Sequence, residues 1–251
     1  MKLSIAGITD IGTVRYNNQD NYIIGNVFRE DVESPRHSHS TETDTEPQLF
    51  GVCDGMGGAS RGEMASYLAV STLAKLYPYE HFNQKYERIF EAVNQAVCDY
   101  TAENNLSACG STIVLFYVNH NRFTLYNVGD SAGYFFRDGK LKKLSKDHTL
   151  YQQYLDLGIR LSSGKNALTQ YLGVDPDEFM IEPYITEKTP LRHGDILFCC
   201  SDGVYNAIEE KELAEIFSSP ASAQEKVSTI IEKCRENKCR DNVTAVIAEV
   251  E

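Results

Sequence analysis

The sequence predicts an α+β fold in which helices pack on antiparallel sheets. Apolar segments with strand periodicity come in groups joined by short turns, and the clearest turn is Asp138-Gly139, between strands expected at 132–136 and 140–144. Segments with helical periodicity come in pairs between these groups, whereas a parallel sheet would need single helices alternating with single strands. These two observations favour helix pairs on antiparallel sheets over a βαβ repeat.

The first half of the chain follows this pattern closely. Residues 21–27 and 49–53 are short apolar stretches and are predicted strands. From 62 to 77, apolar residues recur at the spacing of one helix face, at Met64, Ala65, Leu68, Ala69, Leu73 and Leu76. A second helix with the same spacing is expected to begin near residue 84. Strands are expected next, at 111–118, 123–128, 132–136 and 140–144.

The second half begins with a stretch of unclear periodicity, residues 150–183. Strands are predicted after it at 184–188 and 195–200, and helices at 209–217 and 219–234. Ser219 as N-cap with Pro220 at the first helical position gives the last helix its expected start. A strand at 243–250 closes the chain.

Length and composition exclude several classes of protein. The chain has 251 residues, of which 42% are hydrophobic and 24% charged, and this predicts one large folded domain or two small ones. The net charge is −12 without a basic stripe, so we expect neither a nucleic-acid partner nor an anionic membrane partner. No apolar run is long enough to span a membrane, and the N-terminus lacks a secretory signal. The seven cysteines are an odd number, which favours reduced thiols and a cytoplasmic location.

One acidic segment stands apart in composition. Between Arg29 and Gln48 the chain has six acids, two arginines and a single aliphatic residue, Val32. Because it offers so little apolar surface, we predict a mobile surface loop at 29–47. His37 and His39 lie beside these acids and leave metal binding open as an alternative to a solvated loop.

Aspartates lie at the ends of several predicted strands. Three of them follow apolar runs and are next to a glycine, one precedes the last strand, and one opens an early strand; they are Asp54, Asp130, Asp202, Asp241 and Asp20. Carboxylates gathered at one edge of a sheet repel each other, and a divalent cation or a shifted pKa relieves the repulsion. All-oxygen ligands suit Mg²⁺ or Mn²⁺, and a glycine lets a main-chain carbonyl approach the ion. The alternative is that these are ordinary turn residues.

Together, several short motifs resemble those of the metal-dependent serine/threonine protein phosphatases of type 2C (PPM type), in their compact bacterial form. The motifs follow the family order over nearly the whole chain: TDIGTVRYNNQDN (9–21), DGMGG (54–58) with Gly62-Glu63, GST (110–112), VGDS (128–131), LSKDHT (144–149), NALTQYLG (166–173), CSDGV (200–204) and RDNVT (240–244). The resemblance implies one phosphatase domain over 1–251. Its expected fold is a four-layer α-β-β-α sandwich, with a variable flap at about 151–183.

The resemblance also implies roles for particular residues. Asp54 would bridge two Mn²⁺ or Mg²⁺ ions, with the Gly55 carbonyl on one ion and Asp202 and Asp241 on the other. Asp20 would help to hold the second ion through water. Asp130 would line a weaker third metal site with Asp202. Arg15 would bind the substrate phosphate, and as catalytic groups we expect Arg15 and Asp54.

The implied activity is hydrolysis of phosphoserine and phosphothreonine in proteins by a metal-bridged water, opposing a kinase in bacterial signalling. We expect a monomer whose partners are phosphorylated proteins. The alternatives are a non-catalytic phosphoprotein binder and a phosphatase of small metabolites. A cysteine phosphatase is disfavoured because no Cys-x₅-Arg pattern follows Cys53 or any other cysteine.

Three residues depart from the family pattern. Gln19 stands where many relatives have Glu, Met56 stands where eukaryotic members have His, and Ala132 replaces the Arg of the usual Gly-Asp-Ser-Arg. We expect Gln19 to weaken one metal site and Ala132 to loosen the local packing. Cys234 and Cys239 are close enough in sequence to form a redox pair.

Overall fold

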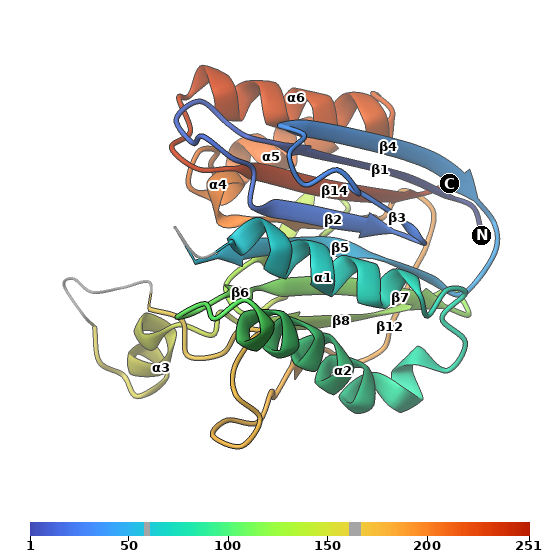
Figure 1. Cartoon of the computed structure of the whole chain (residues 1–251). Helices are drawn as coiled ribbons and strands as arrows, with labels where there is room; N and C mark the ends of the chain where they lie inside the picture. The colour runs from blue at the N-terminus through green and yellow to red at the C-terminus, as the bar shows by residue number, and fades with distance from the viewer. Residues whose placement is uncertain (58–60, 161–166) are drawn as a thin grey trace.

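Two antiparallel β-sheets lie face to face, and helices cover the outer side of each sheet (Figure 1). The computed structural model describes residues 1–57, 61–160 and 167–251. Gly58 of the DGMGG motif, Asn166 of NALTQYLG and residues 161–166 of the predicted flap lie outside this range. The observed layers confirm the predicted α+β sandwich.

The first sheet has the strand order β10-β9-β13-β14-β1-β4. Its strands are β1 (Leu3–Asp10), β4 (Arg36–Thr43), β9 (Ala132–Arg137), β10 (Lys140–Lys143), β13 (Ile196–Cys200) and β14 (Val243–Val250). Its outer face packs against α5 (Glu210–Phe217) and α6 (Ala223–Glu236), with Phe198 of β13 and Phe217 of α5 in edge-to-face contact. The short helix α4 (Asp202–Tyr205) follows β13 directly.

The second sheet has the main order β11-β8-β7-β5-β2-β3, with β12 beside β8 and β6 beside β5. Its strands are β2 (Asp20–Ile24), β3 (Val27–Phe28), β5 (Gln48–Met56), β6 (Gly110–Ser111), β7 (Ile113–Asn119), β8 (Arg122–Val128), β11 (Tyr184–Ile185) and β12 (Thr189–Pro190). Helices α1 (Gly62–Ala74) and α2 (Phe82–Glu103) cover its outer face, where Phe82 stacks on Tyr117.

A third apolar cluster lies between the two sheets and holds them together. Phe50 and Phe116 from the second sheet meet Leu197 and Val246 from the first, and all four side chains are fully buried. Burial of one such side chain stabilises the fold by roughly 1.5–3 kcal/mol. Apolar clusters therefore fill all three interfaces of the four layers, which is the predicted α-β-β-α order.

The predicted loop at 29–47 is wrong for its central part, because Arg36–Thr43 forms β4. This strand pairs with β1 along its full length, from Leu3 opposite Thr43 to Asp10 opposite Arg36. Its side chains are all polar and are alternately exposed and half-buried. Backbone pairing with β1 stabilises the strand without apolar anchors, and charged residues suit a sheet edge because they discourage pairing with other chains.

Arg29 also contradicts the prediction of a mobile loop, since its side chain is fully buried. Nη1 donates to the carbonyls of Asp31, Val32 and Ser34, and Nη2 donates to those of Asn18 and Asp20. One guanidinium thus ties the start of the acidic segment to the residues that lead into β2.

The last helix begins later than the sequence predicted. Its N-cap is Ser222 rather than Ser219, because Ser222 and Glu225 form a reciprocal capping box. Besides β4, the sequence analysis did not predict β1, β12, α4 or α3 (Leu150–Asp156), which Thr149 caps through the N–H of Gln152. Among the helices of the described residues, none is long and apolar enough to cross a membrane.

Candidate functional site

Four of the five predicted aspartates line one cavity of about 440 Å³; they are Asp54, Asp130, Asp202 and Asp241. Each lies where a strand of one or the other sheet begins or ends: near the end of β5, after β8, after β13 and before β14. The neighbouring strands are antiparallel, so the end of one strand lies next to the start of another. The structure thus brings these carboxylates together at one end of the two sheets.

The fifth aspartate, Asp20, is not among the residues that line this cavity, but it is the neighbour of one that does. It opens β2 directly opposite Asp54 in the pairing with β5, and it is only 2% exposed. Its Oδ2 accepts hydrogen bonds from Ser201 Oγ and Thr244 Oγ1, both at 2.7 Å. Asp20 is therefore fixed in place from the first sheet, although it belongs to the second.

Gly55, the residue after Asp54, is packed closely against two other backbone segments, and this packing fixes the position of its carbonyl. A Cβ on Gly55 would lie 2.1 Å from the carbonyl oxygen of Gly62 and 2.5 Å from that of Gln19, so only glycine fits. The N–H of Gly55 donates to the Gln19 carbonyl at 3.1 Å. The start of α1 and the loop before β2 thus meet at Gly55, which lines the cavity beside Asp54.

The environment of these carboxyl groups disfavours their ionisation. Burial raises the pKa of Asp20 and of Asp130 to about 6, that of Asp202 to about 7, and that of Asp54 well above its usual range. After burial, the main cause is repulsion by Asp20 at Asp54 and by Asp241 at Asp202. The cavity holds more negative charge than the protein around it stabilises, and a bound cation would relieve this.

Arg15 is the one cationic side chain among the described residues that line the cavity. Its Nη2 donates to Asp241 Oδ2 at 2.6 Å, and both side chains are partly exposed. This hydrogen bond is the main reason that the pKa of Arg15 is raised. Arg15 therefore lies where the sequence analysis expected it, beside the carboxylates and within reach of a ligand in the cavity.

The donor set fits divalent cations that prefer oxygen. Carboxylates and the backbone at Gly55 supply hard oxygen ligands, and no histidine or cysteine lines this cavity in the described chain. In the same residues, no group of three or more His, Cys, Asp or Glu side chains is already arranged to hold an ion. The cavity is thus lined by candidate metal ligands, and one of them, Asp241, accepts a hydrogen bond from Arg15.

Asn242 is a site residue that the sequence analysis missed. Its Oδ1 accepts the N–H of Gln19 at 2.9 Å, and its Nδ2 donates to the carbonyls of Ile11 and Asn17, both at 3.0 Å. It fastens the loop that carries Arg15 to the start of β14. The sequence analysis singled out only the aspartate of the Asp-Asn pair before the last strand, because the sequence does not show which backbone groups the neighbouring amide contacts.

The residues that depart from the family pattern have different surroundings. Gln19 and Met56 line the cavity, and Gln19 Nε2 donates to Glu63 Oε2 at 3.4 Å. Ala132 is fully buried in the core of the first sheet and does not line the cavity. Cys53 lies next to Asp54 in sequence but is fully buried, and burial raises the pKa of its thiol above the usual range.

Comparisons with known proteins show the family to which the chain belongs. A model of the family "Protein phosphatase 2C" matches residues 36–242. The serine/threonine phosphatase stp of Listeria monocytogenes serotype 4b is 29% identical over 255 residues, which cover 96% of this chain and 93% of that protein.

Two solved structures share the fold. The S. agalactiae serine/threonine phosphatase has a TM-score of 0.84 at 23% identity, over 99% of this chain and 100% of that one. The catalytic domain of the serine/threonine protein phosphatase PstP, solved in complex with two manganese ions, has a TM-score of 0.79 at 28% identity, over all of both chains. The predicted family resemblance is confirmed.

Proposed function

The chain belongs to the protein phosphatase 2C family, whose relatives named above are serine/threonine phosphatases, and on that premise we propose that it hydrolyses phosphoserine and phosphothreonine in proteins with the help of two divalent metal ions. The observation that supports this most is the cavity in which Asp54, Asp202 and Asp241 face Arg15. It combines candidate ligands for cations with a guanidinium, a group suited to binding phosphate.

The proposed metal ligands are Asp54, Gly55 through its carbonyl, Asp202 and Asp241, with Asp20 beside Asp54 and Asp130 at a weaker third site. Bound Mn²⁺ or Mg²⁺ would supply a hydroxide at neutral pH and neutralise the phosphoryl oxygens. The raised pKa values of Asp54 and Asp202 support this assignment, because they mark carboxylates that lack sufficient positive charge. The manganese complex of PstP supports manganese as one suitable ion.

Arg15 would orient the substrate. Its guanidinium can give two parallel hydrogen bonds to a phosphate, and its partly exposed position leaves room for one at the cavity mouth. With Asp241 shared by a cation, the Arg15 guanidinium would turn from that carboxylate to the phosphate. No cysteine or serine nucleophile is needed, and Cys53 is too deeply buried and too weakly acidic to serve as one.

The wider role follows from the proposed activity. We expect the protein to oppose a serine/threonine kinase and to act as a monomer in the cytoplasm. A phosphatase of small metabolites remains the second candidate, because the cavity residues recognise phosphate and not the alcohol to which it is attached.

Release of phosphate from a phosphothreonine peptide and from p-nitrophenyl phosphate tests the proposal. We expect the wild type to turn over both substrates with added Mn²⁺. We expect Asp54→Asn and Asp241→Asn to lose this activity. Asp44→Asn, an exposed aspartate that does not line the cavity, is the matched control and should retain activity. Equal turnover by Asp54→Asn and the control would contradict the proposal. Turnover of p-nitrophenyl phosphate but of no peptide would favour the small-metabolite alternative.

A further inference from the structure

A second and larger cavity opens beside the aspartates. Its volume is about 710 Å³, within the range of ligand-binding clefts, and it lies between the end of α2 and the chain at 168–180. Met56, Gly57, Leu168 and Tyr171 line both this groove and the aspartate cavity. The two are therefore continuous, and a chain bound in one can extend into the other.

The wall of the groove is firmly held. Ser111 and Leu172 exchange backbone hydrogen bonds at 3.0 and 2.8 Å. Asn94 on α2 is 3% exposed; its Oδ1 accepts the N–H groups of Gly173 and Val174, and its Nδ2 donates to the Val174 carbonyl. A Cβ on Gly173 would lie 2.3 Å from a backbone oxygen, so glycine allows this close approach. The groove is thus a built feature of the described chain.

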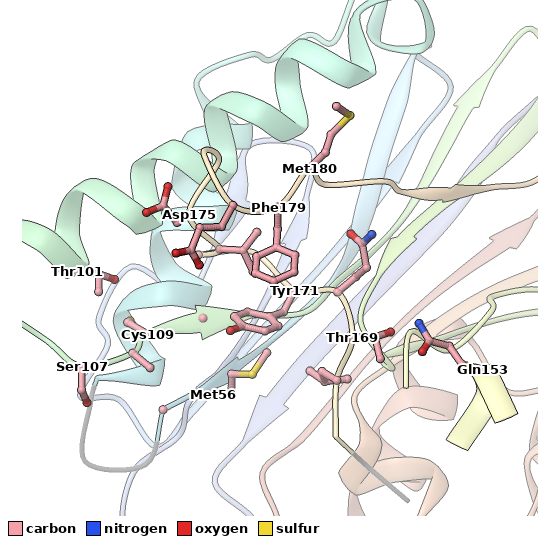
Figure 2. Close-up of a pocket in the computed structure, with 18 residues that line it drawn as sticks. Met56, Thr101, Ser107, Cys109, Gln153, Thr169, Tyr171, Asp175, Phe179 and Met180 are labelled. Atoms are coloured by element: carbon pink, nitrogen blue, oxygen red, sulfur yellow. The ribbon is translucent and has the colours of Figure 1, made fainter. Parts of the chain in front are cut away.

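The lining of the groove has a specific chemistry. Figure 2 shows Met56, Tyr171 and Phe179 facing the same space, and Phe179 remains 62% exposed. The only charged side chains among the described lining residues are Asp175 and Glu178. No basic side chain of the described residues forms an ion pair with either carboxylate. An occupant with apolar bulk and positive charge would complement both features.

We propose that this groove binds the polypeptide that flanks the phosphorylated residue, and that it selects substrates with a bulky apolar side chain and a basic side chain near the phosphate. The inference rests on the proposed function and adds a substrate preference to it. Tyr171 and Phe179 would contact the apolar side chain. Asp175 and Glu178 would contact the basic one.

The test compares two sets of phosphothreonine peptides. One set has Arg and Leu within four residues of the phosphothreonine, and the other has Glu and Ser there, on the N-terminal or the C-terminal side. We expect the wild type to prefer the Arg-Leu set by roughly tenfold in kcat/KM, the size of effect that a few favourable contacts give. Activity on p-nitrophenyl phosphate, which has no flanking chain, reports on the catalytic cavity alone.

Variants then locate the preference. Asp175→Asn with Glu178→Gln should lose the preference for Arg, and Phe179→Ala should lose that for Leu, while both keep full turnover of p-nitrophenyl phosphate. Glu103→Gln with Glu187→Gln removes the same charge from exposed residues outside the groove and should leave the preference unchanged. Equal use of both peptide sets, or a preference that survives the groove variants, would overturn the inference. Failure to hydrolyse any substrate would overturn the proposed function as well.

Discussion

Arg15 donates a hydrogen bond from Nη2 to Oδ2 of Asp241 across 2.6 Å, at the mouth of the aspartate cavity. The same carboxylate is a proposed metal ligand, so Arg15 and a cation compete for it. Under the proposed function this pairing would link metal binding to phosphate binding, because Arg15 would leave a metal-bound Asp241 and turn to the substrate.

Arg15→Ala should raise KM for phosphopeptides by roughly tenfold, because a charge-assisted two-point contact to phosphate is lost. Stability should change by less than about 1 kcal/mol, since the ion pair with Asp241 is partly exposed. Steady-state kinetics and thermal unfolding measure the two effects. Arg88→Ala, an exposed arginine on α2, is the matched control. An unchanged KM would show that Arg15 does not bind the substrate phosphate.

Asp202→Asn should stabilise the metal-free protein at pH 8. The folded protein raises the pKa of Asp202 to about 7, so ionisation of this group costs stability as pH rises from about 4 to 7. Removing the charge should recover roughly 1–3 kcal/mol at pH 8 and little at pH 4. Thermal unfolding in EDTA at both pH values measures this.

With Mn²⁺ present the order should reverse, because the wild type gains stability from the ion and Asp202→Asn gains less. A lower melting temperature of the variant in EDTA at pH 8 would contradict the electrostatic account of the cavity.

Gln19→Glu should lower the Mn²⁺ concentration that gives half-maximal activity, since a full charge replaces an amide that lines the cavity. Glu63 limits the gain, because its Oε2 now accepts a hydrogen bond from the Gln19 amide at 3.4 Å and would repel a carboxylate. The double variant Gln19→Glu with Glu63→Gln should therefore gain more than the single one. Identical Mn²⁺ titrations of all three proteins would show that position 19 does not affect the ions.

Arg29→Met should destabilise the protein by roughly 2–4 kcal/mol, because it removes a buried guanidinium that serves five backbone carbonyls. Arg36→Ala in β4 is the matched control. Its side chain is 46% exposed, and its partner Asp10 keeps a second ion pair with Arg235, so it should cost less than about 1 kcal/mol. Urea unfolding compares the two. Equal small effects would contradict the anchoring role of the Arg29 guanidinium.

The sequence predicted most of the apolar strands and helices because their side chains carry the period of the element. It could not predict β4 in the same way: this strand is held by its backbone against β1, and its polar side chains resemble those of a loop. Ser219-Pro220 was a plausible helix start in the sequence. The helix begins after Ser222 instead, because Ser222 and Glu225 form the two hydrogen bonds of a capping box.

Some residues of the candidate site could be predicted from the sequence, and others could not. Asp54, Asp130, Asp202 and Asp241 could be proposed from strand ends and family motifs, and they line one cavity. Asn242 and Arg29 could not, since their roles depend on backbone carbonyls that are distant in sequence or belong to a segment of loop-like composition.

The central claim is that the aspartate cavity holds two divalent ions, and equilibrium dialysis of the purified protein against Mn²⁺ tests it most directly. We predict at least two ions bound per chain in the wild type, and loss of both tight sites in Asp54→Asn, since Asp54 would contact both ions. Asp44→Asn should bind as the wild type does. Fewer than two ions bound to the wild type, or unchanged binding by Asp54→Asn, would contradict the account.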